Sequence, residues 1–98
     1  MQIGRVIGTV VATQKEEKMT GLKLLVVQLC DARGKPLDGY TVAVDAVGAG
    51  LREMVLVATG SSARQTKATE GRPTDATIMA IVDSWDVGGE IVWDKERE

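Results

Sequence analysis

The sequence predicts an all-β domain, a small barrel or sandwich. Its apolar residues come in short runs rich in valine, isoleucine and leucine, and turn-forming residues separate the runs. Gly4 and Gly8 interrupt the first run, as the bends of a tight barrel require. With 98 residues the chain forms one domain, whose core buries about 60–65% of the surface that the unfolded chain exposes. Oligomerisation would supply further burial.

Each predicted element follows from an apolar run and the turn residues around it. The five predicted strands cover residues 2–13, 24–30, 40–44, 54–59 and 77–82. The charged loop 14–21 separates the first two strands, and glycine and proline mark the connections 31–39 and 45–52. The segment 60–66 predicts a turn and one short helix capped by a serine, before the polar loop 67–73.

A tail is expected after the barrel. Residues 1–85 form the predicted barrel domain, and residues 86–98 form the tail, with one possible last strand at 90–93. Residues 94–98 are all charged, which predicts a frayed end. Trp85 and Trp93 are expected to pack this part of the chain onto the barrel or a neighbour, rather than to stack on a ligand.

Three predicted strands are apolar on both faces, which a single small barrel does not explain. Residues 24–27, 54–58 and 78–82 do not alternate between apolar and polar side chains, so both faces are expected to leave water. Identical neighbouring subunits are the simplest cover for the outer faces. The alternative is a helix over one face, but the one short helix cannot cover three strands.

The composition argues against catalysis and against nucleic-acid or membrane binding. The net charge is −2 with both signs interspersed, aromatic residues make up 3%, and histidine is absent. The only cysteine, Cys30, lies in an apolar run and is expected to be buried rather than nucleophilic. We expect no enzyme activity, metal or cofactor. The first residues lack a signal-peptide layout and no apolar stretch has transmembrane length, which predicts a cytoplasmic protein.

Two segments could bind an anion, and each has a favoured structural alternative. Gly48-Ala49-Gly50 carries the first two glycines of a dinucleotide-binding motif, but Glu53 occupies the third place, which favours a tight turn. The segment 60–64 places two hydroxyls and Arg64 near a helix start, where an anion can bind. A helix cap is favoured, with Arg64 bonded to a carboxylate or to carbonyls, within the chain or across a subunit boundary.

Asp45, Asp75 and Asp83 are candidates for a catalytic or metal-binding carboxylate set, but nothing in their spacing is specific. Asp45 and Asp83 each follow an apolar strand, where a carboxylate caps a turn or pairs with arginine. We take Arg64, Asp45 and Asp83 as candidates for contacts between subunits.

Four segments together resemble the EutN/CcmL family of bacterial microcompartment shell vertex proteins. They read GRVIGTVVAT at residues 4–13, GLKLLVV at 21–27, VAVDAVGAG through EMVLV to GSSAR at 42–64, and DA with AIVD at 75–83. The order and spacing agree over residues 1–85. Two departures stand out: Arg52 replaces a frequent glycine, which predicts a different turn after Gly50, and residues 86–98 match no family pattern.

The resemblance implies an OB-like five-stranded barrel that assembles as a homopentamer and is not an enzyme. Such pentamers occupy the five-fold corners of a shell that hexameric proteins otherwise tile. Within the ring, Gly60, Ser61 and Ser62 are candidates for the five-fold axis, because small residues let five backbones come close. Their hydroxyls would line a narrow opening or, as we favour, a packing gap.

Two other function classes compete with the vertex protein. An OB-fold binding module for nucleic acid or a small ligand would need a basic groove with aromatic platforms, and the predicted strands carry only Tyr40. A small enzyme or ligand-binding subunit would use the turn at 60–64, for which the sequence offers no catalytic constellation.

Overall fold

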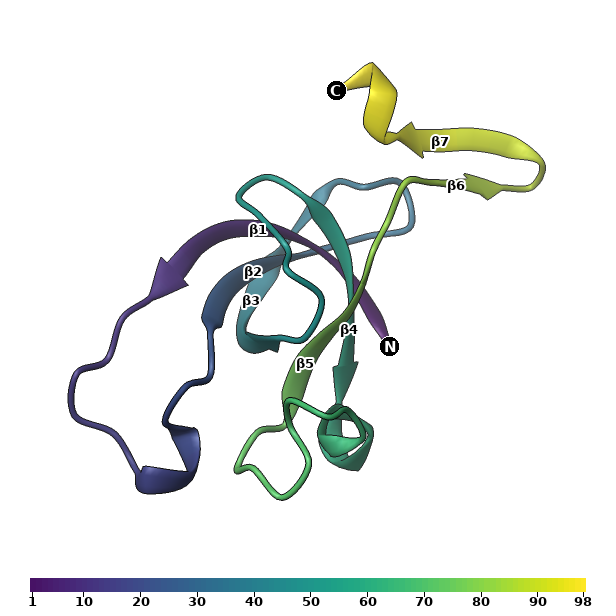
Figure 1. Cartoon of the computed structure of the whole chain (residues 1–98). Helices are drawn as coiled ribbons and strands as arrows, with labels where there is room; N and C mark the ends of the chain where they lie inside the picture. Colours follow the sequence, from purple (N-terminus) through teal and green to yellow (C-terminus); the bar gives the residue numbers. More distant parts are fainter.

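The computed structural model describes residues 1–98 as a closed five-stranded barrel followed by a two-stranded sheet (Figure 1). The barrel order is β1-β2-β3-β5-β4, and β4 pairs with β1 to close it. The barrel strands are β1 (Gln2–Val10), β2 (Leu24–Cys30), β3 (Pro36–Asp45), β4 (Met54–Thr59) and β5 (Ala76–Ile81). The second sheet consists of β6 (Ser84–Val87) and β7 (Glu90–Asp94). The predicted all-β barrel is therefore confirmed.

The barrel contains one short parallel contact. All other neighbouring strands are antiparallel, whereas β3 and β5 run parallel and pair only at Val44 with Thr77 and at Asp45 with Ile78. The larger part of β3 therefore extends beyond its partner on that side. A β-bulge at Ile7 bends β1 where it leaves β4.

The core fills the barrel with alternate residues of its strands and small residues of the loops. Leu25 and Val27 of β2 and Val55 and Val57 of β4 point inward and are buried, since successive side chains of a strand face opposite sides. Nine buried residues form this cluster: Val6, Leu25, Val27, Ala43, Ala49, Val55, Val57, Ala76 and Ile78.

A second apolar cluster lies outside the barrel, under the tail. Met54 on the outer face of β4 is fully buried and packs with Cys30 and Trp93. The rings of Trp85 and Trp93 stack 5.4 Å apart at 18°, and Trp85 Nε1 donates to the Ala32 carbonyl at 2.7 Å. The tail thus covers part of the apolar outer faces for which the sequence predicted neighbouring subunits. The expected packing of the two tryptophans onto the barrel is confirmed.

Several predicted elements need correction. There is no α-helix, because the segment expected to be helical is a 3₁₀ turn, η2 (Gly60–Arg64). Its N-cap residue is Thr59, whose side chain makes no capping hydrogen bond, so the predicted serine cap is wrong. β3 begins at Pro36 rather than at residue 40, and β1 ends at Val10 rather than at residue 13. β6 was not expected, because its four residues carry no apolar run.

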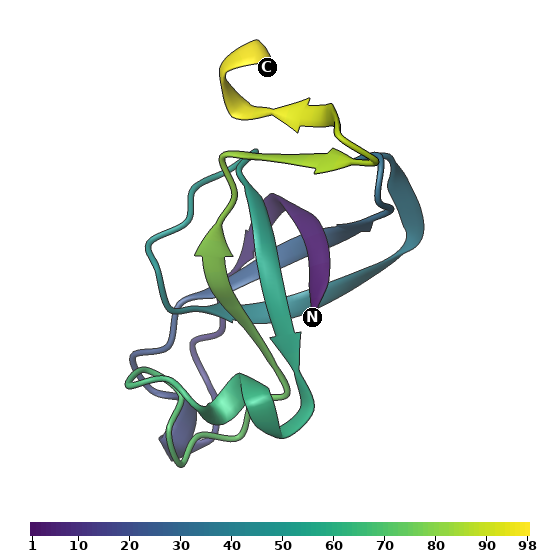
Figure 2. The same ribbon diagram turned by 90° about the vertical axis from the view of Figure 1, so that its right-hand side faces the viewer.

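The C-terminal residues are tied to the barrel and are not frayed. The strand expected at 90–93 is β7, and η3 (Lys95–Arg97) follows it, whereas η1 (Glu17–Met19) lies in the first loop. The Glu98 carboxylate accepts hydrogen bonds from Arg5 and from Trp93 Nε1, both at 2.6 Å. The ion pair between Arg5 of β1 and Glu98 ties the C-terminus to the barrel. The hairpin of β6 and β7 lies at one end of the barrel (Figure 2). No helix has the length and apolarity needed to span a membrane.

Candidate assembly surfaces

Asp45 ends β3 and organises the turn that follows it. Its Oδ1 accepts the backbone N–H groups of Val47, Gly48 and Ala49 at 3.0–3.2 Å. Lys23 Nζ lies 3.4 Å from Oδ2, and the Asp45 side chain is 1% exposed. The predicted turn-capping role is confirmed, with lysine rather than arginine as the ionic partner. Gly48–Gly50 leads into the tight turn of this connection, which residues 50–53 form with a hydrogen bond from Glu53 N to the Gly50 carbonyl at 3.2 Å.

Burial of the Asp45 carboxylate would by itself raise its pKa, but the hydrogen bonds from Val47 and Ala49 and the Lys23 ammonium together lower the pKa below its ordinary value. A lowered folded-state pKa means that the carboxylate stabilises the fold above the unfolded pKa of about 4. That stabilisation is lost as pH falls through the folded-state value.

Replacing Asp45 with alanine is expected to lower the free energy of unfolding by about 2–3 kcal/mol, because three backbone N–H groups and the Lys23 ammonium lose their acceptor. Asp45→Asn keeps one acceptor oxygen and should lose about 1 kcal/mol at pH 7. Urea unfolding between pH 3 and pH 7 measures both values. The difference between wild type and Asp45→Asn should shrink in acid, and a pH-independent difference would contradict the charge argument.

The loop 46–53 returns along β1 and carries an unusual backbone conformation. Arg52 N donates to the Val6 carbonyl at 2.8 Å, and the Val6 N–H donates to Glu53 at 2.9 Å. Arg52 has φ 72°, and no other non-glycine residue has a positive φ. Arginine therefore forms here a left-handed turn that glycine would form more easily. Its exposed guanidinium makes no hydrogen bond or ion pair within the chain.

Glu53 joins this loop to the tail. One carboxylate oxygen accepts the Gly50 N–H at 2.7 Å and the other accepts Lys95 Nζ at 3.0 Å. The bond from Lys95 and the Gly50 N–H hold the pKa of Glu53 below its usual range. The loop is thus fixed at both ends, at Asp45 and at Glu53.

The candidate axis residues Gly60, Ser61 and Ser62 lie together on an exposed turn at the end of β4. Ala63 is buried behind them, and its carbonyl accepts the Thr77 hydroxyl at 2.6 Å, which anchors the turn to β5. The turn stands at the opposite end of the barrel from the hairpin (Figure 1).

Arg64 and Asp83 are placed far apart by the fold. Arg64 Nη1 donates to the Thr74 carbonyl at 2.9 Å, so its partner within the chain is a carbonyl group, one of the two predicted kinds. Asp83 lies in the connection between β5 and β6; its carbonyl accepts the Lys95 N–H at 2.8 Å, and its side chain is exposed. The structure does not bring Arg64, Asp45 and Asp83 into one site, and no group of three potential metal ligands occurs.

Three large apolar side chains of β3 are exposed where the sequence did not place an interface. On β3, Leu37, Tyr40 and Val42 are exposed, Tyr40 to 68%. These residues were assigned partly to a turn and partly to an alternating strand. The sequence did contain a signal for this exposed surface. Leu37, Tyr40 and Val42 are large apolar residues around Gly39, and residues 37–42 carry only one charge.

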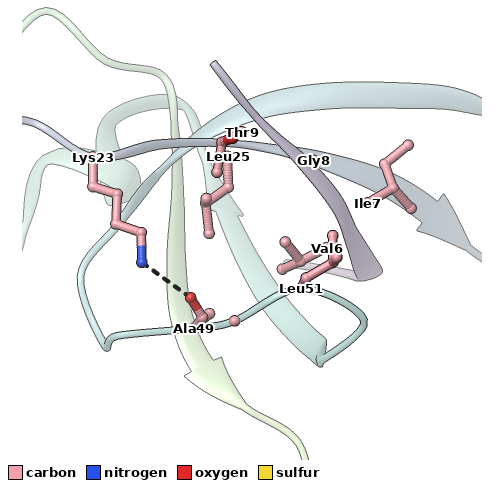
Figure 3. A pocket seen from close by; sticks show the side chains of 9 residues that line it. Val6, Ile7, Gly8, Thr9, Lys23, Leu25, Ala49 and Leu51 are labelled. Carbon is pink, nitrogen blue, oxygen red and sulfur yellow. Dashed lines mark hydrogen bonds between the residues drawn. The ribbon is translucent and has the colours of Figure 1, made fainter. Parts of the chain in front are cut away.

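A second apolar surface is a cleft of about 380 Å³ between β1, the start of β2 and the loop 46–53 (Figure 3). Val6, Leu25 and Leu51 point into it, and Leu51 is 63% exposed. The Lys23 side chain lies along one side of the cleft, and its Nζ donates to the Ala49 carbonyl at 3.3 Å. The sequence alone did not predict this cleft, because distant segments line it.

Comparison with known proteins connects these surfaces to an assembly. The family described as "Ethanolamine utilisation protein EutN/carboxysome" matches residues 1–83. The carboxysome shell vertex protein CcmL of Gloeobacter violaceus is 51% identical over 98 residues, which cover 100% of this chain and 98% of that protein. The microcompartment shell vertex protein EutN of Salmonella typhimurium is 40% identical over 95 residues, 97% of this chain and 96% of the relative.

Solved structures agree with these sequence matches. The structure of Gloeobacter violaceus CcmL has a TM-score of 0.94 at 51% identity, covering 98% of this chain and 99% of that chain. GrpN, described as a pentameric microcompartment shell protein from Rhodospirillum rubrum, has a TM-score of 0.82 at 45% identity, covering 89% and 99%. The match to the Gloeobacter violaceus protein spans the tail, for which the sequence alone showed no family pattern.

Proposed function

This chain belongs to the EutN/CcmL family, and we propose on that basis that it forms a homopentamer that caps the five-fold vertices of a bacterial microcompartment shell. The function is structural, and the chain is not an enzyme, since the relatives that match it along its length are shell vertex proteins. The observation that carries the proposal is a pentameric relative at 45% identity whose fold superposes with a TM-score of 0.82.

The role follows from the geometry of closed shells. A flat lattice of six-fold units can roll into a tube but cannot close in three dimensions, and five-fold units supply the missing curvature. Hexameric shell proteins, tiling the facets in the bacterial cytoplasm, are therefore the proposed partners of the pentamer. Nucleic acid and membranes are not proposed partners, because the net charge is −2 and both signs are interspersed.

We also propose positions for the candidate residues within this ring. The exposed turn of Gly60, Ser61 and Ser62 is placed near the five-fold axis, where its small side chains let five copies approach. Arg64 has donors left after its bond to Thr74, and exposed Asp83 has a free carboxylate, so both suit contacts at a subunit boundary. Asp45 would act there through the loop 46–53 that it holds in place.

Native mass spectrometry of the purified chain at low micromolar concentration should show a pentamer as the dominant species. The physical reason is that a 98-residue barrel with large exposed apolar residues gains stability by burying them in an obligate interface. Dilution to nanomolar concentration gives the stability of the ring. A monomer dominant at micromolar concentration would overturn the proposed function.

The shell is proposed to be a carboxysome. The match to CcmL of Gloeobacter violaceus reaches 51% identity, against 40% for EutN of Salmonella typhimurium, and both alignments cover nearly the whole chain. Expression beside the hexameric proteins of each shell type tests this proposal. Closed particles should form with carboxysome hexamers in preference to those of the ethanolamine shell.

A further inference from the structure

One side of β3 is an open strand edge. Asp45 N donates to the Lys23 carbonyl before β2 at 2.9 Å, and the Gln28 side-chain amide donates to the carbonyls of Leu37 and Gly39 at 2.6 and 2.8 Å. Odd-numbered residues of β3 therefore direct their backbone groups toward β2. Because these groups alternate along a strand, the even-numbered residues direct theirs away from β2. Only Val44 and Asp45 meet β5 there, so the groups of residues 38, 40 and 42 face an edge with no partner strand.

The same edge is apolar and exposed. Leu37, Tyr40 and Val42 are 49%, 68% and 41% exposed in the single chain. An open edge with exposed apolar side chains invites pairing with another chain, and proteins usually charge, twist or cover such edges. This segment carries one charge only, Asp38, whose side chain makes no hydrogen bond or ion pair within the chain. We define residues 37–42 as the β3 edge.

The opposite side of the same sheet offers a concave counterpart. In the sheet β1-β2-β3, β1 beyond Val6 pairs with β2 alone, and the 380 Å³ cleft lies beside it (Figure 3). Ile7 and Leu51 form its exposed apolar walls, 50% and 63% exposed. The β3 edge and the cleft therefore occupy opposite edges of one three-stranded sheet.

The charges at the two surfaces are complementary. Asp38 lies in the β3 edge. Arg52 directly follows Leu51, which lines the cleft, and its side chain has no partner in its own chain. Arg52 also holds a left-handed backbone conformation, which costs energy for any residue with a Cβ. A carboxylate from outside the chain would complete the pair.

We propose that the β3 edge of one copy packs against the cleft of the next copy, with Tyr40 as the anchor in the cleft and Asp38 facing Arg52. A second copy is the occupant because a ring of identical subunits needs two different and complementary surfaces on each subunit. This inference rests on the proposed function, which the pentameric relative at 45% identity supports. Tyrosine is also the residue type that commonly dominates interface energetics.

Two complementary variants test the head-to-tail contact. Tyr40→Glu damages only the β3 edge, and Leu51→Asp damages only the cleft. Both side chains are largely exposed in the single chain, so the barrel should remain folded in each variant. Each variant alone should be monomeric by native mass spectrometry at about 10 μM, a concentration at which the wild-type chain should be a pentamer. Mixed in equal amounts, they should form a heterodimer, since one intact edge and one intact cleft remain.

Ile91→Glu is the matched control, because Ile91 is 48% exposed on the hairpin and belongs to neither surface. It should remain pentameric. If Tyr40→Glu or Leu51→Asp remains pentameric while wild type is a pentamer, the surface assignment is overturned and the proposed function stands. A mixture without heterodimer also overturns it. A wild-type monomer in the same experiment instead removes the proposed function itself.

Charge exchange tests the pair of Asp38 and Arg52. Asp38→Arg and Arg52→Asp should each raise the concentration of half-dissociation by about tenfold or more, since each places like charges together. The double variant should restore it to within about threefold of wild type. Glu90→Lys, which reverses an exposed charge on the hairpin beside the control residue Ile91, should have no effect. A double variant no better than the singles would disprove this pairing.

Discussion

Shells assembled without this protein are expected to remain open or to elongate into tubes. The reason is topological, because a lattice of hexamers bends in one direction without defects and needs five-fold units to close. Encapsulated enzymes should stay active in lysate, since the chain contributes no catalysis. Electron microscopy of particles from a deletion strain, or from co-expressed hexamers with and without this chain, measures the effect.

Adding the protein back in small amounts should restore closed particles, because only the corners require it. The Tyr40→Glu variant, which should fold without forming a ring, serves as the control and should fail to restore closure. Closed shells of normal shape in a deletion strain that has no second vertex protein would defeat the proposed role.

Gly4→Ala is expected to cause the largest loss of stability among small substitutions, about 3 kcal/mol or more. Gly4 is buried in β1, and a Cβ there would overlap Val27 Cγ1 and lie 2.9 Å from the Gln28 carbonyl oxygen. Because part of the obstruction is backbone, a side-chain rotation cannot relieve it. The barrel would have to separate β1 from β2, so urea unfolding should show a lower midpoint and the soluble yield should fall.

Gly8→Ala in the same strand separates this steric effect from the loss of a glycine. A Cβ at Gly8 would meet only Val26 side-chain atoms at 3.9 Å, an ordinary contact. The substitution should be neutral or stabilise the fold by up to about 1 kcal/mol, because alanine has less freedom in the unfolded chain. Equal losses for Gly4→Ala and Gly8→Ala would contradict the explanation by close strand packing.

Local pattern was enough to predict most strands. The β2 and β4 runs were predicted with the bounds that the structure shows, since each is a mostly apolar run with valines at its centre, between polar connections. β3 was predicted too short, because Pro36 and Gly39 are signals for turns and yet both lie on an edge where a strand tolerates them. η2 was predicted as a helix because a 3₁₀ turn and the first turn of an α-helix share their capping residues.

Some features of the candidate surfaces could also be predicted from local sequence, and others could not. Asp45 could be recognised as a turn cap because its partners are two to four residues away. The apolar outer faces of β2, β4 and β5 indicated that more surface had to leave water, and the tail covers part of it. What covers them could not be read locally: Trp93, far along the chain, covers Met54. The open β3 edge and the cleft arise from long-range strand pairing.

The sequence by itself determined that this chain is an all-β domain of the EutN/CcmL family with more apolar surface than one barrel can bury, because alternation, turn chemistry and motif order are local properties. Only the tertiary structure decided which apolar surface stays open. The short β3–β5 contact leaves the β3 edge unpaired, and the return of the loop 46–53 along β1 forms the cleft and sets Leu51 in its wall, next to Arg52. Both depend on pairings between residues distant in the chain, whose energies no local pattern encodes.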